Sequence, residues 1–485
     1  MSGALSDLKR LGGSSGLYAI GELARRGLAF FLLPLYTRFL DPAEYGVLEL
    51  LNALSGVLFA GLLLGLPSAL TKCYHRDCEG EREKSRILST TLLLDLPVLL
   101  VVGSLLAVFA EPIGVWVIGE AGRGPLIQLS VATAVVLSVM AIILASFRAR
   151  EQALAFVWLN LTQFVPAMAL NIVLVVRYEM GILGVLWGNL ISSLLALALG
   201  LWMVRHEVWN GPERRLVRPL LHFGVLLVPV MLASWAIDMS DRYVLRIYRS
   251  LEEVAVYGVG YKIAMVLQMA IVWPFQLAWP AVSFSISKRD DHKASYARVL
   301  TYLLLALVWG WLGLSLMARA VLTPFVGEAY DQAYLMVVPV ALGYVFNGIH
   351  YCLSPGVHIA GRTRYLTMIS GFAAVLNLGL NLWVVPRYGA LGAAWTTTAT
   401  FLFIAAGTAV VSQSAHPVRY EMRRLLTLAL AGAAVYAAAV AFEPAGMWAG
   451  VAWHAALSCL GFPIALLALG FLDAGERAWL MSWRR

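Results

Sequence analysis

Long runs of apolar residues recur along the whole chain and restrict the folds that it can adopt. Residues 125–147 and 181–204, for example, contain no Asp, Glu, Lys or Arg. A helix of about 20 residues crosses the hydrocarbon core of a bilayer and satisfies its own backbone hydrogen bonds there. The composition agrees, because 60% of the 485 residues are hydrophobic and 13% are charged, against about 45–50% and 25% in a soluble domain. The sequence therefore predicts an all-α integral membrane protein.

The apolar runs predict about fourteen transmembrane helices. They lie near residues 14–38, 44–70, 87–110, 125–147, 153–176, 181–204, 219–245, 254–283, 299–318, 333–358, 365–386, 389–412, 424–442 and 448–472. If the N-terminus is cytoplasmic, most of the 36 lysines and arginines fall in cytoplasmic segments. Short cytoplasmic loops carry such an excess of basic residues. We therefore expect an even number of spans, with both termini in the cytoplasm.

Two parts of the chain resemble each other and indicate an internal repeat. Residues 171–187 read NIVLVVRYEMGILGVLW and residues 381–395 read NLWVVPRYGALGAAW, so that an Asn, an Arg-Tyr pair, a Gly and a Trp recur in order. The Tyr-Gly pair at 45–46 also recurs at 257–258. Both members of each match lie on the same predicted side of the membrane. The repeat is therefore predicted to be parallel, with its axis along the membrane normal.

The repeat predicts two six-helix lobes with a pseudo-twofold axis, followed by two further helices. The predicted N-lobe covers residues 1–210 with helices 1–6, and the C-lobe covers 211–415 with helices 7–12. Residues 416–485 hold helices 13–14 and a cytoplasmic tail. Rocking of one lobe against the other would give alternating access to a central cavity. The alternative is that the duplication only builds a larger bundle.

Charged side chains inside the predicted spans favour transport. An ionisable residue at the bilayer centre costs about 2.5–3.5 kcal/mol on insertion scales, so it must face a polar interior. The first, seventh and eighth spans hold seven of them, namely Glu22, Arg25, Arg26, Asp238, Asp241, Arg242 and Lys262. The four bases predict a cationic cavity wall for an anionic headgroup, because arginine forks suit diphosphate geometry.

The acids of this set allow two other interpretations. At a spacing of four residues, Glu22 could simply neutralise Arg26, and Asp238 could neutralise Arg242. Three acids against four bases still leave a positive excess. Alternatively, the acids Glu22, Asp238 and Asp241 could couple transport to protons or sodium. No other cofactor and no metal site is expected.

Weaker candidates lie elsewhere in the spans. Gln268 and Gln276, with Trp273, occupy the eighth span, and amides and indoles suit sugar hydroxyls and sugar faces. Interfacial aromatic residues explain the Trp equally well. Pro274 and Pro280 are expected to kink that helix. Asp95 in the third span is either a cavity residue or the partner of a base.

Several classes of function are excluded by what the sequence lacks. The basic residues are spread over many short loops rather than gathered on one face, which argues against nucleic acid. No GxxxxGK[ST] motif occurs, so ATP does not drive the chain directly. HExxH does not occur, and the loops are too short to carry a catalytic domain. We therefore do not expect an enzyme.

The segment 31–50, FLLPLYTRFLDPAEYGVLEL, resembles the first-loop signature of a known transporter family. The matching residues are Pro34, Leu35, Tyr36, Arg38, Leu40, Pro42, Glu44, Tyr45 and Gly46. Asp241-Arg242, Glu253 and the Tyr-Gly pair at 257–258 look like its counterpart in the second half, and the RYG at 387–389 also fits. The family is the polysaccharide transporter (Wzx-type flippase) family. It belongs to the MOP flippase superfamily, with the MATE antiporters and the lipid II flippase.

The resemblance implies a flippase in a bacterial inner membrane. Its substrate would be an undecaprenyl-diphosphate-linked oligosaccharide for O-antigen, capsule or exopolysaccharide assembly, and membrane lipid and the polysaccharide polymerase machinery would be its partners. The implied state is a monomer. Related lipid II flippases use arginines on their first and eighth helices, where Arg25 or Arg26 and Lys262 lie here. The alternative is a cation-coupled MATE-like antiporter, which the excess of bases disfavours.

Overall fold

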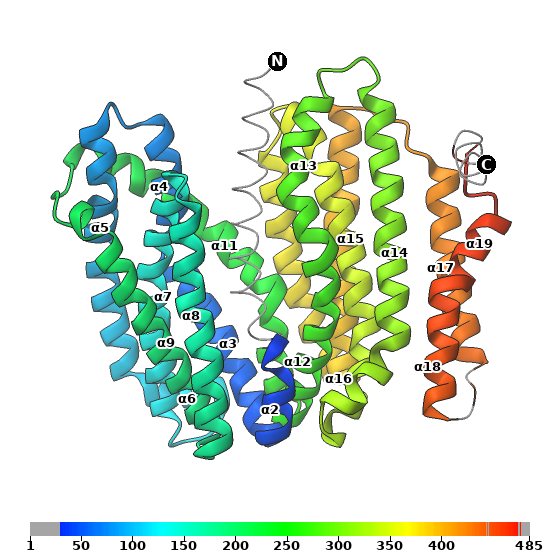
Figure 1. The fold of residues 1–485 in the computed structure, drawn as a ribbon, viewed down its shortest axis with the longest axis horizontal. Helices are drawn as coiled ribbons and strands as arrows, with labels where there is room; N and C mark the ends of the chain where they lie inside the picture. Colours follow the sequence, from blue (N-terminus) through cyan, green and yellow to red (C-terminus); the bar gives the residue numbers. More distant parts are fainter. Residues whose placement is uncertain (1–29, 443, 445, 474–475, 477–485) are drawn as a thin grey trace. The chain divides into compact units, whose positions relative to one another are not determined.

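The structure is a computed structural model that describes residues 30–442, 444, 446–473 and 476. Within those residues every regular element is a helix, as the apolar runs predicted (Figure 1). The contacts divide the chain into two compact units, the first ending at Ala255 and the second beginning at Val256.

The first unit contains one short helix followed by long apolar helices and their connections. They are α2 (Leu33–Phe39), α3 (Pro42–Leu62), α4 (Leu66–Arg76), α5 (Glu81–Val108), α6 (Ala110–Ile118), α7 (Gly124–Ala149), α8 (Ala153–Ile172), the π-helix η1 (Val173–Arg177), α9 (Gly181–Met203), α10 (Arg205–Val208), α11 (Arg214–Tyr248) and the start of α12 (Leu251–Leu267).

The second unit continues α12 and ends with the C-terminal helices. Its other elements are the π-helix η2 (Gln268–Val272), α13 (Trp273–Ile286), α14 (His292–Phe325), the 3₁₀ helix η3 (Glu328–Ala333), α15 (Tyr334–Ile359), α16 (Arg364–Ala415), α17 (Met422–Ala441), α18 (Met447–Ala456), the π-helix η4 (Leu457–Gly461) and α19 (Phe462–Ala468).

The boundary between the units differs from the predicted boundary between the lobes. We expected α11 to open the second lobe after residue 210, whereas α11 packs against α3, α4 and α5 and belongs to the first unit. Its contacts with these helices, rather than its place in the repeat, put it in the first unit. The six-plus-six-plus-two division of the repeat stays a prediction.

The described residues contain twelve helical segments that are long and apolar enough to cross a membrane. One of them is α16, whose 52 residues would extend about 78 Å as one straight helix. It turns at Gly389, with φ 55° and ψ −140°, and so holds the two spans predicted at 365–386 and 389–412. Counting α16 twice brings the twelve to thirteen. Most of the first predicted span lies outside the described residues, so the total of fourteen stays a prediction.

The backbone shows the internal repeat. Gly181 and Gly389, which occupy the same place in the two copies, have φ of 54° and 55°. Glycine reaches this region without the steric cost that a Cβ brings. The equivalent residues Asn171 and Asn381 are both fully buried.

The next glycine of each copy makes equivalent contacts. A Cβ at Gly184 would lie 3.2 Å from the backbone of Leu174, and a Cβ at Gly392 would lie 3.2 Å from the carbonyl oxygen of Val384. Leu174 and Val384 are themselves equivalent in the aligned copies. The two glycines thus make equivalent contacts in both units, as expected of a duplicated unit, although residues 173–177 form a π-helix and the equivalent residues lie in α16.

Helices α3 and α4 form one span that is broken in the middle. Leu64 and Gly65 have φ of 47° and 65°, so the chain leaves the helix there. A Cβ at Gly65 would lie 3.0 Å from the carbonyl carbon of Gly224 on α11, which leaves room for glycine only. Pro67 then restarts the helix in its first turn, where a missing N–H costs nothing. The predicted span 44–70 did not include this break.

Polar contacts fix the linker between α9 and α11 to α5. Ser89 Oγ donates a hydrogen bond to the carbonyl of Gly211 at 2.6 Å. The backbone N–H of Glu213 donates to Thr90 Oγ1 at 2.8 Å, and its carboxylate pairs with Arg86 at 3.4 Å. We name residues 207–215 the linker segment.

The C-terminal helices α17 and α18 pack against α14 in the second unit. Arg424 donates hydrogen bonds to the Glu476 carboxylate at 2.9 and 3.0 Å and lies over the ring of Phe471. Tyr302 and the backbone N–H of Asp473 also donate to this carboxylate. Burial raises the pKa of Glu476. These hydrogen bonds and the positive charge of Arg424 together lower it by more, so the pKa of Glu476 lies below its usual value.

Candidate functional site

The predicted site residues are distributed over both units. Glu22, Arg25 and Arg26 lie outside the described residues, so their roles stay predictions. Asp238, Asp241 and Arg242 lie on α11 in the first unit. Lys262 on α12, Gln268 in η2, and Trp273 and Gln276 on α13 lie in the second unit.

Arg242 is the centre of a buried charge cluster in the first unit. Its Nη1 donates to a carboxylate oxygen of Asp241 at 2.7 Å and to the main-chain carbonyl of Asp238 at 2.6 Å. Its Nε lies 3.8 Å from a carboxylate oxygen of Glu49 on α3. The Arg242 side chain is 2% exposed, that of Asp241 0% and that of Glu49 4%. Buried ions are retained only when they are paired and hydrogen-bonded in this way.

This arrangement bears on the predicted role of Arg242. The guanidinium contacts carboxylates from two helices, α3 and α11, and so ties these helices together. A diphosphate would compete with both carboxylates for the same donors. Pairing with acids was the alternative interpretation of Arg242, and its carboxylate contacts include Asp241 and Glu49. Its role as a headgroup ligand stays a prediction.

Glu49 was missed in the sequence. It lies inside an apolar run, four residues after Tyr45 and one turn into the second predicted span. An acid within an apolar span is the signal that singled out the other charges, and it applies equally here. Glu49 therefore belongs with Asp241 and Arg242 in the candidate site.

Aromatic side chains join α11 to α3 beside this cluster. Trp235 Nε1 donates to the carbonyl of Ala53 at 2.8 Å, and the Tyr243 hydroxyl donates to the carbonyl of Leu50 at 3.2 Å. The two rings lie 6.0 Å apart. Each ring thus packs through its apolar body while its polar end satisfies a backbone carbonyl.

In the second unit, Lys262 and Gln268 are buried. Lys262 is 9% exposed and Gln268 is 7% exposed. Asn347 of α15 donates from its amide nitrogen to the Gln268 side-chain oxygen at 3.3 Å. This side-chain oxygen is therefore already engaged, and a sugar hydroxyl would share or replace that bond.

The other two predicted sugar contacts lie on α13, next to η2. Trp273 and Gln276 are half-buried. Pro274 is the second residue of α13, and the π-helix η2 ends directly before α13 begins. A proline in a helix leaves a carbonyl without its partner, and a π-type turn is one local adjustment that accommodates it. A π-helix thus directly precedes α13, and the predicted kink at the prolines stays a prediction.

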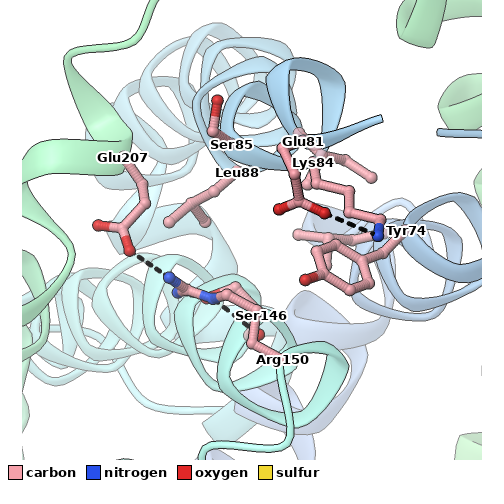
Figure 2. A pocket seen from close by; sticks show the side chains of 10 residues that line it. Tyr74, Glu81, Lys84, Ser85, Leu88, Ser146, Arg150 and Glu207 are labelled. Atoms are coloured by element: carbon pink, nitrogen blue, oxygen red, sulfur yellow. Dashed lines mark hydrogen bonds and ion pairs between the residues drawn. The ribbon is translucent and has the colours of Figure 1, made fainter. Parts of the chain in front are cut away.

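A pocket of about 170 Å³ lies elsewhere in the first unit, where α4, α5, α7 and α10 meet (Figure 2). Arg150 pairs with Glu207 on one wall. Lys84 pairs with Glu81 on the other, at 3.1 Å. Because each base already has an acid beside it, this pocket is not the net-positive site that the sequence predicted.

Comparisons with known proteins agree with this architecture. A family model described as polysaccharide biosynthesis protein matches residues 11–285. A probable low-salt glycan biosynthesis flippase, Agl15 of Haloferax volcanii, is 20% identical over 389 residues, which cover 79% of each chain.

Solved structures share the fold. The lipid II flippase MurJ, in an inward closed conformation, superposes with a TM-score of 0.74 at 14% identity, over 93% of this chain and 97% of that one. An inward-facing MATE multidrug resistance transporter of the MOP superfamily gives 0.61 at 15% identity, over 83% and 95%. The Vibrio cholerae MATE transporter VcmN gives 0.60 at 14%, over 86% and 98%. At these identities the likeness establishes the fold alone.

Proposed function

Because the chain belongs to the polysaccharide biosynthesis protein family, we propose that it is a flippase for a lipid-linked oligosaccharide. The substrate is an oligosaccharide on undecaprenyl diphosphate, and the membrane is the bacterial inner membrane with both chain termini in the cytoplasm. The product would feed the polymerase machinery of O-antigen, capsule or exopolysaccharide assembly. The protein acts as a monomer and catalyses no covalent reaction.

The observation that carries the proposal is the match between fold and family. The family is named for polysaccharide biosynthesis, and the fold is that of a flippase for another lipid-linked saccharide, over 93% of the chain. The named role of the Haloferax volcanii relative, a glycan biosynthesis flippase, supports the same substrate class. Two compact units are what alternating access by rigid-body rocking requires.

The proposed substrate determines the roles of the polar residues. The diphosphate is bound by four bases, since guanidinium forks and an ammonium match phosphate oxygens. These bases are Arg25, Arg26, Arg242 and Lys262. The sugar contacts Gln268, Trp273 and Gln276. Coupling to protons or sodium uses Glu22, Asp238 and Asp241, and Glu49 joins that group because it lies beside Arg242.

Deletion of the gene tests the function directly. A flippase mutant keeps synthesising the lipid-linked oligosaccharide and cannot deliver it, so this intermediate accumulates on the cytoplasmic side and surface polysaccharide is lost. Mass spectrometry of extracted lipids identifies the sugar. A deletion strain with normal surface polysaccharide and no accumulated intermediate would refute the proposal.

Paired variants test the anion site. Arg25→Ala together with Arg242→Ala should abolish surface polysaccharide while the protein stays in the membrane at its usual level. The matched control is Arg215→Ala, because the Arg215 side chain is 54% exposed and an exposed ion pair contributes about 1 kcal/mol or less. Normal polysaccharide in the double variant would reject the anion-site assignment while leaving the flippase proposal to the deletion test.

A second candidate is a cation-coupled MATE-like antiporter. The Glu49 and Asp241 carboxylates around a single guanidinium favour it, since acidic sites attract cationic drugs. Increased accumulation of a fluorescent cationic dye in the deletion strain, with surface polysaccharide unchanged, would support this candidate over the flippase.

A further inference from the structure

One buried acid of the first unit takes no part in the cluster around Arg242. Asp95 on α5 is 1% exposed. Neither of its carboxylate oxygens has a hydrogen-bond partner in the chain as the structure describes it. An isolated charge buried in this way is costly, and such groups bind a compensating ion or become neutral. Inside a membrane span, an ionisable residue of this kind indicates a functional site.

Asp95 lies at the same depth as the break between α3 and α4. Leu99, one turn after Asp95, packs in one core cluster with Leu62, the last residue of α3. Leu92, almost one turn before Asp95, packs on another cluster that contains Leu66, the first residue of α4. Along α3 and α4, the break lies between residues of the two clusters. Along α5, Asp95 lies between residues that pack on the same two clusters.

Backbone carbonyl oxygens become available at this depth. The last turn of α3 ends at Leu62, and the N–H of Leu63 donates to the carbonyl of Phe59 at 3.3 Å. The carbonyls of the last three residues of α3 accept no backbone N–H from the residues that the structure describes. Ser138 of α7 is fully buried one turn after Ala134, a member of the cluster around Leu62. Its hydroxyl oxygen retains lone pairs that can accept.

We propose that Asp95 and the break between α3 and α4 form a binding site for a monovalent cation, either a proton or a sodium ion. The carboxylate supplies the negative charge, and carbonyl oxygens of the interrupted helices supply neutral ligands. Carbonyls of discontinuous membrane helices coordinate coupling ions in this way. Binding does not rest on the proposed function, whereas its use to drive translocation does.

Two charged or titratable groups on the helices beside α5, within the described part of the first unit, are engaged or directed elsewhere. The helices packed against α5 are α3, α4, α6, α7, α10 and α11. In that order, these helices carry the titratable residues Glu49, Lys72, Glu111, Arg148, Glu207 and His222. Of these, Lys72 pairs with Asp77 at 3.5 Å. His222 lies two residues before Gly224, which contacts the break, but the His222 side chain is exposed.

The test is thermal unfolding of the purified full-length protein. One series varies sodium at constant ionic strength with choline, and the other varies pH in sodium-free buffer. A ligand of the native state raises the melting temperature once its concentration passes Kd, by about 1–3 °C for each further tenfold increase. A response to sodium identifies sodium, and a melting temperature that rises as the pH falls identifies the proton.

Asp95→Asn keeps the shape of the side chain and removes its charge. This variant should lose the response that the wild type shows and should be at least as stable as the wild type without the cation. Asp77→Asn is the matched control, because it removes an acid at the end of α4 that already has a lysine partner, and it should keep the response.

Three results would overturn the site. They are a wild type that responds to neither cation, an Asp95→Asn variant that responds as the wild type does, and an Asp95→Asn variant that no longer folds. The last would show that a base holds the carboxylate. A protein that responds to the cation and flips no lipid would refute the proposed function and leave the site intact.

Discussion

Substitution of Gly46 by alanine tests the closest backbone approach in the first unit. Gly46 lies in the first turns of α3, and a Cβ there would overlap the carbonyl oxygen of Leu251, the first residue of α12, and lie 2.8 Å from its carbon. Optimal contact between carbon atoms needs about 3.5 Å. The two helices must therefore separate by about 0.7 Å, and no side-chain rotation relieves the overlap, because both sides are backbone.

The cost follows from two opposing effects. Inserting a methyl group into a close-packed contact costs about 1–3 kcal/mol, whereas alanine gains about 0.5–1 kcal/mol over glycine within a helix. Gly61→Ala is the matched control, because Gly61 lies in the same helix and has nothing within 4 Å of its Cβ position. The difference in unfolding free energy between the two variants then equals the packing cost, about 1–3 kcal/mol.

Thermal unfolding of the two purified variants in the same detergent measures this difference. We expect Gly46→Ala to melt several degrees below Gly61→Ala, which itself should melt at or slightly above the wild type. Equal melting temperatures for the two variants would refute the close approach of α3 to α12.

Three further predictions concern the second unit. Gly389→Ala should cost about 1–3 kcal/mol, because φ of 55° with ψ of −140° strains any residue that has a Cβ, whereas Gly379→Ala in open space should not destabilise; equal unfolding midpoints would contradict this. Asn347→Leu should cost about 1–3 kcal/mol, because the buried Gln268 oxygen loses its donor, and an unchanged midpoint would show that another donor replaces it. Because the pKa of Glu476 is lowered in the folded protein, its stabilisation is present above the unfolded pKa of about 4.3 and is lost as the pH falls through the folded value; Glu476→Gln should remove this acid sensitivity from the melting curve.

Much of the fold was predictable, because a bilayer leaves few alternatives to long apolar helices. The repeat at residues 171–187 and 381–395 was also visible, since glycine with positive φ and tight packing restrict residue choice at the same places in both copies. The break at Leu64 and Gly65 was not predicted. Its cause is the contact of Gly65 with Gly224 on α11, a partner far away in sequence.

The sequence singled out most residues of the candidate site, but it could not show which of them contact each other. Helical spacing suggested that the Asp238 carboxylate neutralises Arg242, and this stays a prediction. The contacts that the spacing did not suggest are those of the guanidinium with the main-chain carbonyl of Asp238 and with the carboxylate of its direct neighbour Asp241. Glu49 joins from α3, which only tertiary packing can bring to this point. The unit to which α11 belongs was likewise decided by packing across the repeat boundary.

The linker segment has a consequence for synthesis. Its partners Arg86, Ser89 and Thr90 all precede it in the chain, so they have already left the ribosome when the linker segment appears. Domains fold as units during synthesis, the N-terminal one first. The first unit can therefore close its end at the linker segment, and pack α11 against α3, α4 and α5, before most of the second copy of the repeat has been translated.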